Sequence, residues 1–149
     1  MFNMTKHVTH HFSKEHESHL EEIGDYMTSP VFSVDAESTV QEAANVMHSK
    51  HIGSVFVKEN NKFIGIITES NLSRKIVAKG LDPKTTKATE IMTEPLVTID
   101  CMEHVEKANQ LMAQKKIRHL GVTKNGEVVG VLSVKDLVSF FANPRLRTW

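Results

Sequence analysis

The sequence predicts a mixed α/β chain of the α+β type, made of two β-α-β-β-α repeats packed with pseudo-twofold symmetry. The main observation is an internal repeat. Residues 25–72, the first copy, align without a gap on residues 90–137, the second copy, at an offset of 65 residues. Thirteen of the forty-eight aligned pairs are identical, against about three expected from background residue frequencies. Two short copies favour a duplicated subdomain, packed face to face around a cleft, rather than a solenoid.

Short apolar runs and helical spacing predict the first half of each copy. Strands are expected at 31–34 and 96–99, after Pro30 and Pro95. A helix follows each strand, and we expect it to begin with a capping box, at Ser38 with Gln41 and at Asp100 with Glu103. The predicted buried stripes are Val40, Ala43, Ala44 and Met47 in the first copy, and Val105, Ala108, Leu111 and Met112 in the second.

A hairpin and a second helix complete each copy. Strands 55–57 and 63–67 form the first hairpin, and strands 120–122 and 128–132 the second. Asn125-Gly126 is the strongest turn signal because both residues accept positive φ, and Asn60-Asn61 occupies the matching place. Thr68 and Ser133 are expected to cap helices over 69–78 and 134–141, the first ending at Gly80.

The predicted domain organisation follows from the repeat and from the polar ends of the chain. We expect a polar, histidine-rich N-terminal tail or helix at 1–22 and the first repeat at 23–81. A connector containing Pro83 opens the next segment, 82–144, which holds the second repeat, and a C-terminal tail covers 145–149.

Composition restricts the classes of function. Lysine plus arginine equal aspartate plus glutamate at 18 each, so the overall charge does not favour nucleic acid or an acidic membrane. No apolar run is long enough to cross a bilayer. The single cysteine, Cys101, excludes a disulfide or a thiolate zinc cluster within one chain. We therefore expect a cytoplasmic protein in a reducing compartment.

One motif occurs at the end of both hairpins. Residues 65–71 and 130–136 share the pattern Gly, two apolar residues, Ser or Thr, two variable residues, then Asn or Asp. A hydroxyl followed three residues later by an acid is a common helix start, although Glu or Gln is the usual partner. In a functional interpretation, the glycine leaves room for a ligand, the helix N-terminus faces a phosphate, and Asp136 accepts hydrogen bonds from ribose hydroxyls.

These features together resemble a known family. Met27-Thr28-Ser29-Pro30, Met92-Thr93-Glu94-Pro95, the two glycine motifs and the linker GLDPKTTKATEIMT are similar to a tandem pair of CBS (cystathionine-β-synthase) domains, also called a Bateman module. The resemblance covers about residues 23–142. It implies two nucleotide sites at most, in the cleft between the repeats.

The resemblance also implies which residues form each site. The main site comprises Val131, Ser133 and Asp136 of the second copy with Pro30, Phe32, Ile52 and Gly53 of the first. The symmetric, weaker site comprises Ile66, Thr68 and Asn71 with Pro95, Val97, Ile117, Arg118 and His119. Asn71 departs from the acidic pattern, and an amide is a weaker partner for a ribose diol than a carboxylate.

The implied ligand is an adenosyl compound: AMP, ADP, ATP or S-adenosylmethionine, as a regulatory ligand and not a catalytic cofactor. Arg118 and His119 replace Gly53 and Ser54, which suggests a ligand with phosphates, although Arg118 equally fits a solvated charge at a strand end. The resemblance further implies a homodimer through the helices at 69–78 and 134–141, and output through a regulated protein that the sequence does not name.

Two other functions stay open. A ligand-free dimerisation scaffold fits the same fold. Metal binding by the N-terminal histidines is the other, since His7 with His10 or His11 has helical spacing, with His16 and His19 nearby. No metal site with defined ligand spacing is completed, so we predict none. An enzyme is not expected, because neither paired carboxylates nor a nucleophile with a base occur at interpretable spacing.

Overall fold

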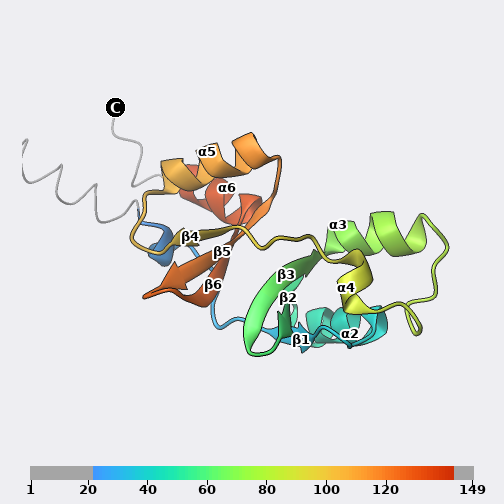
Figure 1. The fold of residues 1–149 in the computed structure, drawn as a ribbon. Helices are drawn as coiled ribbons and strands as arrows, with labels where there is room; N and C mark the ends of the chain where they lie inside the picture. Colours follow the sequence, from blue (N-terminus) through green and yellow to red (C-terminus); the bar gives the residue numbers. More distant parts are fainter. Residues whose placement is uncertain (1–21, 143–149) are drawn as a thin grey trace, which may run out of the picture. The chain divides into compact units, whose positions relative to one another are not determined.

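The computed structural model describes residues 22–142. Their contacts define two compact units (Figure 1). The β1–β3 unit spans Pro30–Val97, and the β4–β6 unit combines the chain up to Ser29 with the chain from Thr98 onward. Each unit holds one three-stranded sheet, which confirms the predicted mixed α/β class.

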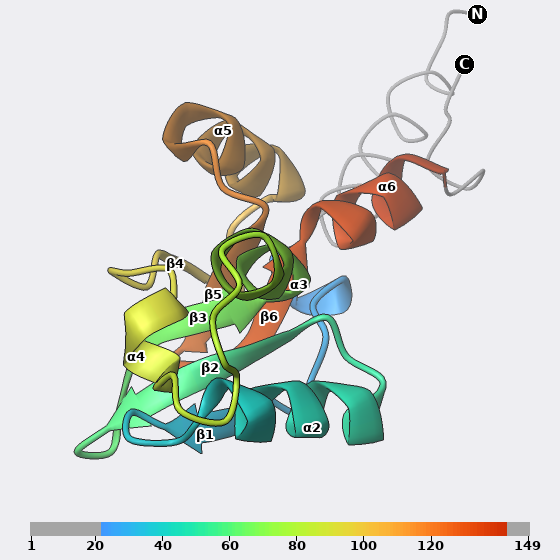
Figure 2. The same cartoon turned by 90° about the vertical axis from the view of Figure 1, so that its right-hand side faces the viewer.

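The β1–β3 unit begins with β1 (Ser33–Asp35), α2 (Val40–Lys50), β2 (Ser54–Glu59) and β3 (Lys62–Thr68). It continues through α3 (Glu69–Asn71), η2 (Leu72–Val77) and α4 (Ala88–Ile91). β1 pairs with β2 in parallel, and β2 pairs with β3 antiparallel, so the three strands lie side by side (Figure 2). Helices pack on this sheet through buried side chains from each element: Val34, Val40, Ala43, Met47, Val55, Val57, Ile67, Ile76 and Ile91 among them.

The β4–β6 unit repeats this order. After the 3-10 turn η1 (Ile23–Asp25), it contains β4 (Thr98–Asp100), α5 (Val105–Lys115), β5 (His119–Lys124), β6 (Glu127–Ser133) and α6 (Val134–Ala142). β4 is parallel to β5, and β5 is antiparallel to β6. The predicted β-α-β-β-α order is therefore confirmed in both copies. The short elements η1 and α4 were not predicted.

The turn and stripe predictions hold in detail. Asn125 and Gly126 take φ of 52° and 80°, and Asn60 and Asn61 take 49° and 61°, as hairpin turns of this kind require. Of the predicted stripes, Val40, Ala43 and Met47 are buried, as are Val105, Ala108 and Met112. Ala44 and Leu111 are half-buried at the edges of these stripes.

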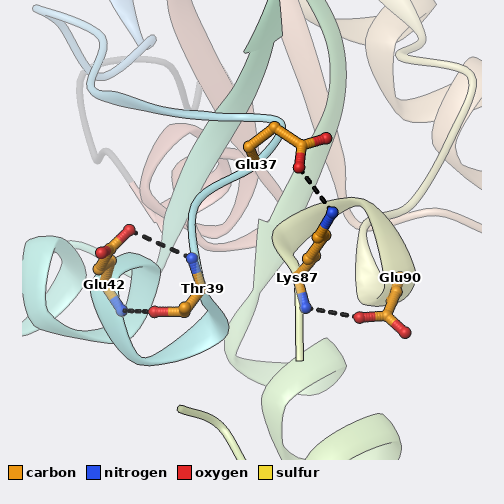
Figure 3. Close-up of polar contacts among 5 residues, drawn as sticks. All are labelled: Glu37, Thr39, Glu42, Lys87 and Glu90. Atoms are coloured by element: carbon orange, nitrogen blue, oxygen red, sulfur yellow. Dashed lines mark hydrogen bonds and ion pairs between the residues drawn. The ribbon is translucent and has the colours of Figure 1, made fainter. Parts of the chain in front are cut away.

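The predicted starts of the first helices were wrong. The capping box of α2 lies one residue later than expected: Thr39 Oγ1 accepts from the Glu42 N–H at 3.2 Å, and Glu42 accepts from the Thr39 N–H at 3.1 Å (Figure 3). Threonine and glutamate form the more usual pair, which explains the shift. Asp100 instead accepts from the Met102 N–H at 2.9 Å and forms a turn, so α5 begins only at Val105.

The connector between the copies is tied to α2 by a second set of contacts in Figure 3. The backbones of Thr39 and Lys87 form a β-bridge. The Lys87 side chain binds Glu37 at 2.6 Å, and this hydrogen bond raises the pKa of Lys87. The Lys87 N–H donates to Glu90 at 2.6 Å, which caps α4. The connector thus leads directly into a short helix of the β1–β3 unit.

The second helix of the first copy differs from its counterpart. η2 is a π-helix, with the Ala78 N–H bonded to the Ser73 carbonyl at 2.9 Å, whereas α6 is a regular α-helix. The wider turn places Ile76 in the core at 6% exposure, although its counterpart Phe141 is 55% exposed. Lys75 is half-buried at the position where the second copy buries Phe140. The π-helix therefore keeps a charged residue out of a position that an α-helix would bury.

The opening segments of the two copies are exchanged between the sheets. Met27 and Thr28 belong to the β4–β6 unit, where Thr28 pairs with Val131 of β6. Met92 and Thr93 belong to the β1–β3 unit, where Thr93 pairs with Ile66 of β3. We call these two pairs of residues the Met-Thr segments. The predicted domain boundaries follow the repeats and stay predictions.

The Met-Thr segments explain the glycine of each motif. A Cβ atom on Gly65 would lie 2.7 Å from Met92 Sδ and 2.8 Å from the Thr93 carbonyl oxygen. A Cβ atom on Gly130 would lie 2.5 Å from Met27 Sδ and 3.1 Å from the Thr28 carbonyl oxygen. The interpretation that these glycines leave room for a ligand was therefore wrong, since the chain itself fills the space.

Gly65→Ala should lower the free energy of unfolding by about 1–3 kcal/mol, because the added methyl group overlaps a backbone carbonyl that is held in a β-bridge. Urea denaturation measures this change. Gly53→Ala is the matched control, since its Cβ would meet nothing closer than 3.6 Å and should change stability by less than about 0.5 kcal/mol. Equal stability of the two variants would contradict the assignment.

Candidate functional site

The second copy of the motif joins β6 to α6. Asp136 Oδ2 accepts hydrogen bonds from the Ser133 N–H at 2.8 Å and from the Ser133 hydroxyl at 3.0 Å. Ser133 Oγ in turn accepts from the Asp136 N–H at 3.3 Å. These contacts form a capping box. Asp136 therefore caps α6, although Glu or Gln is the usual partner at this position.

The cap occupies only one side of the Asp136 carboxylate. Among residues 22–142, Oδ1 accepts no hydrogen bond, and the side chain is half-buried. An ionised carboxylate offers several acceptor positions, so Oδ1 can still take hydrogen bonds from hydroxyl groups. Capping and ligand binding are thus compatible at this residue.

Two further candidates, Arg118 and His119, lie beside this motif. His119 pairs with Ser133 across β5 and β6, and the Arg118 carbonyl accepts from the Val134 N–H at 3.0 Å. Arg118 is exposed, and His119 is half-buried. In the β4–β6 unit, the structure therefore brings Arg118 and His119 next to Ser133.

The other candidates in the β4–β6 unit have structural contacts. Val131 exchanges two backbone hydrogen bonds with Thr28, at 2.8 and 3.0 Å. The Ile117 N–H donates to the Met112 carbonyl at 3.0 Å, just after the end of α5. Both side chains are half-buried. Both residues are therefore held in place by backbone hydrogen bonds.

The first copy of the motif joins β3 to α3. Asn71 Oδ1 accepts from the Thr68 N–H at 2.8 Å and from the Thr68 hydroxyl at 3.1 Å, so Asn71 also caps its helix. Unlike Asp136, Asn71 makes a further contact, because Nδ2 donates to Thr93 Oγ1 at 3.1 Å. Asn71 is only 8% exposed. Both ends of this amide are occupied.

The remaining candidates are in the β1–β3 unit. The Gly53 carbonyl accepts from the Glu69 N–H at 3.2 Å, and Ile52 is half-buried beside it. The Phe32 carbonyl accepts from the Phe56 N–H at 3.0 Å, and Lys50 Nζ lies 5.1 Å from the centre of the Phe32 ring. Pro30 and Pro95 are exposed, and Val97 is half-buried. Ile66 is buried in β3.

The two predicted sites each draw on both units. The structure brings one group together around Thr68, namely Ile52, Gly53, Ile66 and Asn71. It brings a second group together around Ser133, namely Arg118, His119, Val131 and Asp136. The full sets of site residues stay predictions.

Sequence reasoning missed two residues at these motifs. The Glu69 carboxylate lies beside Gly53, with its oxygens 3.7 and 3.8 Å from a Cβ atom placed there. Thr93 binds the Asn71 amide. Comparison of the two copies in the sequence could have indicated both residues. Glu69 replaces an apolar residue of the second copy, Val134, and Thr93 is identical to its counterpart Thr28.

Residues 22–142 lack two features, a cluster of metal-ligating side chains and a membrane-spanning helix. That part of the chain contains no group of three histidine, cysteine, aspartate or glutamate side chains able to hold a metal ion. None of its helices is long and apolar enough to cross a membrane. The histidines at 7, 10, 11, 16 and 19 lie outside the described residues.

Comparison with known proteins identifies the fold and motifs. A family model described as CBS domain matches residues 23–78 and 88–143, which is most of the chain. The duplicated β-α-β-β-α unit with its two glycine motifs therefore defines a tandem pair. The chain belongs to the CBS-domain family, which confirms the resemblance.

Among curated relatives, the CBS domain-containing protein YhcV of Bacillus subtilis is 33% identical over 115 residues. That match covers 77% of this chain and 81% of YhcV. This chain spans less of two other relatives, 60% and 62% of their lengths.

Solved structures share the fold. A CBS domain protein of Pyrobaculum aerophilum, PAE2072, described as complexed with AMP, has a TM-score of 0.72 and 26% identity. The match covers 84% of this chain and 94% of PAE2072. A hexameric CBS-CP12 protein from bloom-forming cyanobacteria has a TM-score of 0.75 and 30% identity, with coverages of 83% and 74%.

Asp136→Ala should lower the free energy of unfolding by about 0.5–2 kcal/mol, because it removes the acceptor of the Ser133 N–H and hydroxyl. Asp136→Asn should cost much less, since Asn71 makes the same cap in the first copy. Urea denaturation of both variants checks this. Equal losses for alanine and asparagine would show that Asn cannot replace Asp as a cap in α6.

Proposed function

We propose that this chain is a non-catalytic regulatory module that binds an adenine nucleotide or a related adenosyl ligand. The observation that carries the proposal is the Asp136 carboxylate, which caps α6 with one oxygen, while its other oxygen accepts no hydrogen bond within residues 22–142. An AMP complex of the similar protein PAE2072 supports the class of ligand. Asp136 would accept hydrogen bonds from the ribose hydroxyls.

The proposed main site uses Val131, Ser133 and Asp136 from the second copy, with Pro30, Phe32, Ile52 and Gly53 as the predicted contribution of the first. We add Arg118 and His119 to it, because both lie beside Ser133. A guanidinium can bind a phosphate through two N–H groups, and the first N–H groups of α6 are suited to an anion. A ligand with phosphates, such as AMP, ADP or ATP, is therefore favoured over S-adenosylmethionine.

AMP should raise the melting temperature of the chain progressively as its concentration rises above the Kd, since a ligand at 100 times its Kd stabilises the folded state by about 2.7 kcal/mol. Asp136→Asn keeps the cap but replaces a charged acceptor with an amide, so AMP affinity should fall about 10- to 100-fold. Differential scanning fluorimetry and isothermal titration calorimetry measure the two effects.

The matched control is Asp35→Asn, an exposed aspartate on β1 that should leave AMP affinity unchanged. If AMP, ATP and S-adenosylmethionine all left the melting temperature unchanged, the ligand-free scaffold would be the better interpretation. A specific observation favours that alternative, because the capping box alone accounts for Ser133 and Asp136.

The output of the module would pass through self-association and an unidentified regulated protein. The outer face of α6 exposes three apolar side chains one helical turn apart: Val134 at 41%, Val138 at 61% and Phe141 at 55%. The matching positions of α3 and η2 are Glu69 and Ser73, which are exposed and polar, and Ile76, which is buried. The similar CBS-CP12 protein is described as hexameric. We infer a homodimer centred on α6 rather than shared equally by both helices.

Val138→Glu should shift the chain from dimer to monomer in sedimentation velocity, because it places a charge in the centre of the inferred interface. Val77→Glu is the matched control on η2 and should leave the dimer intact. A wild-type chain that sediments as a monomer, with and without AMP, would contradict the inferred homodimer.

The cytoplasmic location stays a prediction from sequence.

A further inference from the structure

We propose that the chain binds one adenosyl ligand, at Asp136, and that Asn71 is a positioning residue that fastens the linker instead of a second ligand site. The stoichiometry rests on the proposed function. The proposal comes from differences between the two copies of the motif, which occupy equivalent places in units of the same fold.

The first difference is the state of the side chain at the end of the motif. The Asn71 amide donates to Thr93 and accepts from Thr68, and the residue is buried. Because Asn71 Oδ1 already accepts two hydrogen bonds, a ribose hydroxyl could donate to it only by displacing a Thr68 contact. Asp136 requires no such exchange, because its Oδ1 accepts nothing within residues 22–142.

The second difference lies in the Met-Thr segments. Thr93 makes a side-chain hydrogen bond to the helix start of the first copy. Thr28 occupies the equivalent place in the second copy, but its side chain makes no hydrogen bond to Asp136 and is exposed. Thr93, at the end of the linker, is thus held by its own side chain as well as by its backbone. Within residues 22–142, Thr28 is held by backbone hydrogen bonds only.

A further pair of contacts shows the same contrast one turn later. Lys75 Nζ donates to the Ile91 carbonyl at 3.1 Å, at the end of α4. The equivalent residues in the second copy are Phe140 and Tyr26, whose rings pack edge to face with centroids 5.1 Å apart. The first copy therefore uses two polar contacts to hold its linker, at Asn71 and at Lys75.

Charge gives the third difference. In the first copy, the Glu69 carboxylate lies beside Gly53, so an anion would meet a negative charge at that helix start. In the second copy, Val134 replaces Glu69, and Arg118 replaces Gly53. The two helix starts therefore differ in charge, because the first copy carries a carboxylate beside Gly53 and the second carries Arg118 in place of that glycine.

Together these differences assign separate tasks to the duplicated motifs. The first copy fixes the start of the second repeat by holding Ile91 and Thr93. In the second copy, Asp136 Oδ1 accepts no hydrogen bond within residues 22–142, and Arg118 lies beside the same helix start. Only the second copy would change its contacts when ligand binds.

Calorimetric titration of the full chain with AMP should give one site per chain. Thr93→Val removes the hydroxyl that Asn71 binds, so it should lower the melting temperature by about 2–4 °C without ligand. Thr28→Val, the equivalent change in the second copy, should shift it by less than about 1 °C. Neither a first-copy ligand site nor a loose linker predicts this combination.

Two failures can be told apart. Two AMP molecules per chain would overturn this inference and leave the proposed function standing. No AMP binding at all would overturn the proposed function and the stoichiometry with it. Equal melting temperatures for Thr93→Val and wild type would overturn the role of Asn71, whatever AMP does.

Discussion

The structure depends on the close approach of each Met-Thr segment to a strand of the sheet it lies on. Thr28 pairs with Val131, and Ile66 pairs with Thr93, through backbone hydrogen bonds of 2.8–3.1 Å. Glycine is required opposite both segments, because any side chain at Gly65 or Gly130 would overlap the Met-Thr segment that packs against it. Each sheet is thus completed by the opening segment of the other copy, and neither copy of the repeat is a self-contained folding unit.

Duplication followed by divergence explains how one chain holds two versions of this contact. The matched core positions are conserved between the copies, with Val, Ala and Met buried in both α2 and α5. The positions after the glycine differ in chemistry: Asn71 against Asp136, Glu69 against Val134, and Lys75 against Phe140. Packing constrains the buried positions equally in both copies, whereas the motif positions are free to take polar linker contacts in the first copy and the proposed ligand contacts in the second.

The sequence predicted the order of elements well, because period, turn residues and the repeat all agreed, as at Asn125-Gly126 and the α2 and α5 stripes. It did not predict the π-helix at Leu72–Val77, which results from a tertiary need to bury Ile76 rather than Lys75. The role of Gly65 could not be predicted from the sequence either, since Met92, the nearest residue of the Met-Thr segment, is 27 residues away in the chain. Contacts between distant segments leave no local pattern to read.

From the sequence, capping and ligand recognition are alternative explanations of Ser133 and Asp136. In the proposed site the two act together, because the cap positions the carboxylate for the ligand. Holding Oδ2 on the Ser133 N–H and hydroxyl fixes the Asp136 rotamer and the direction of Oδ1 before any ligand arrives. A group that is already ordered loses little side-chain entropy on binding. In the proposed site, the cap would contribute to ligand affinity by preorganising the carboxylate, and the same cap in Asn71 orients an amide toward Thr93 instead.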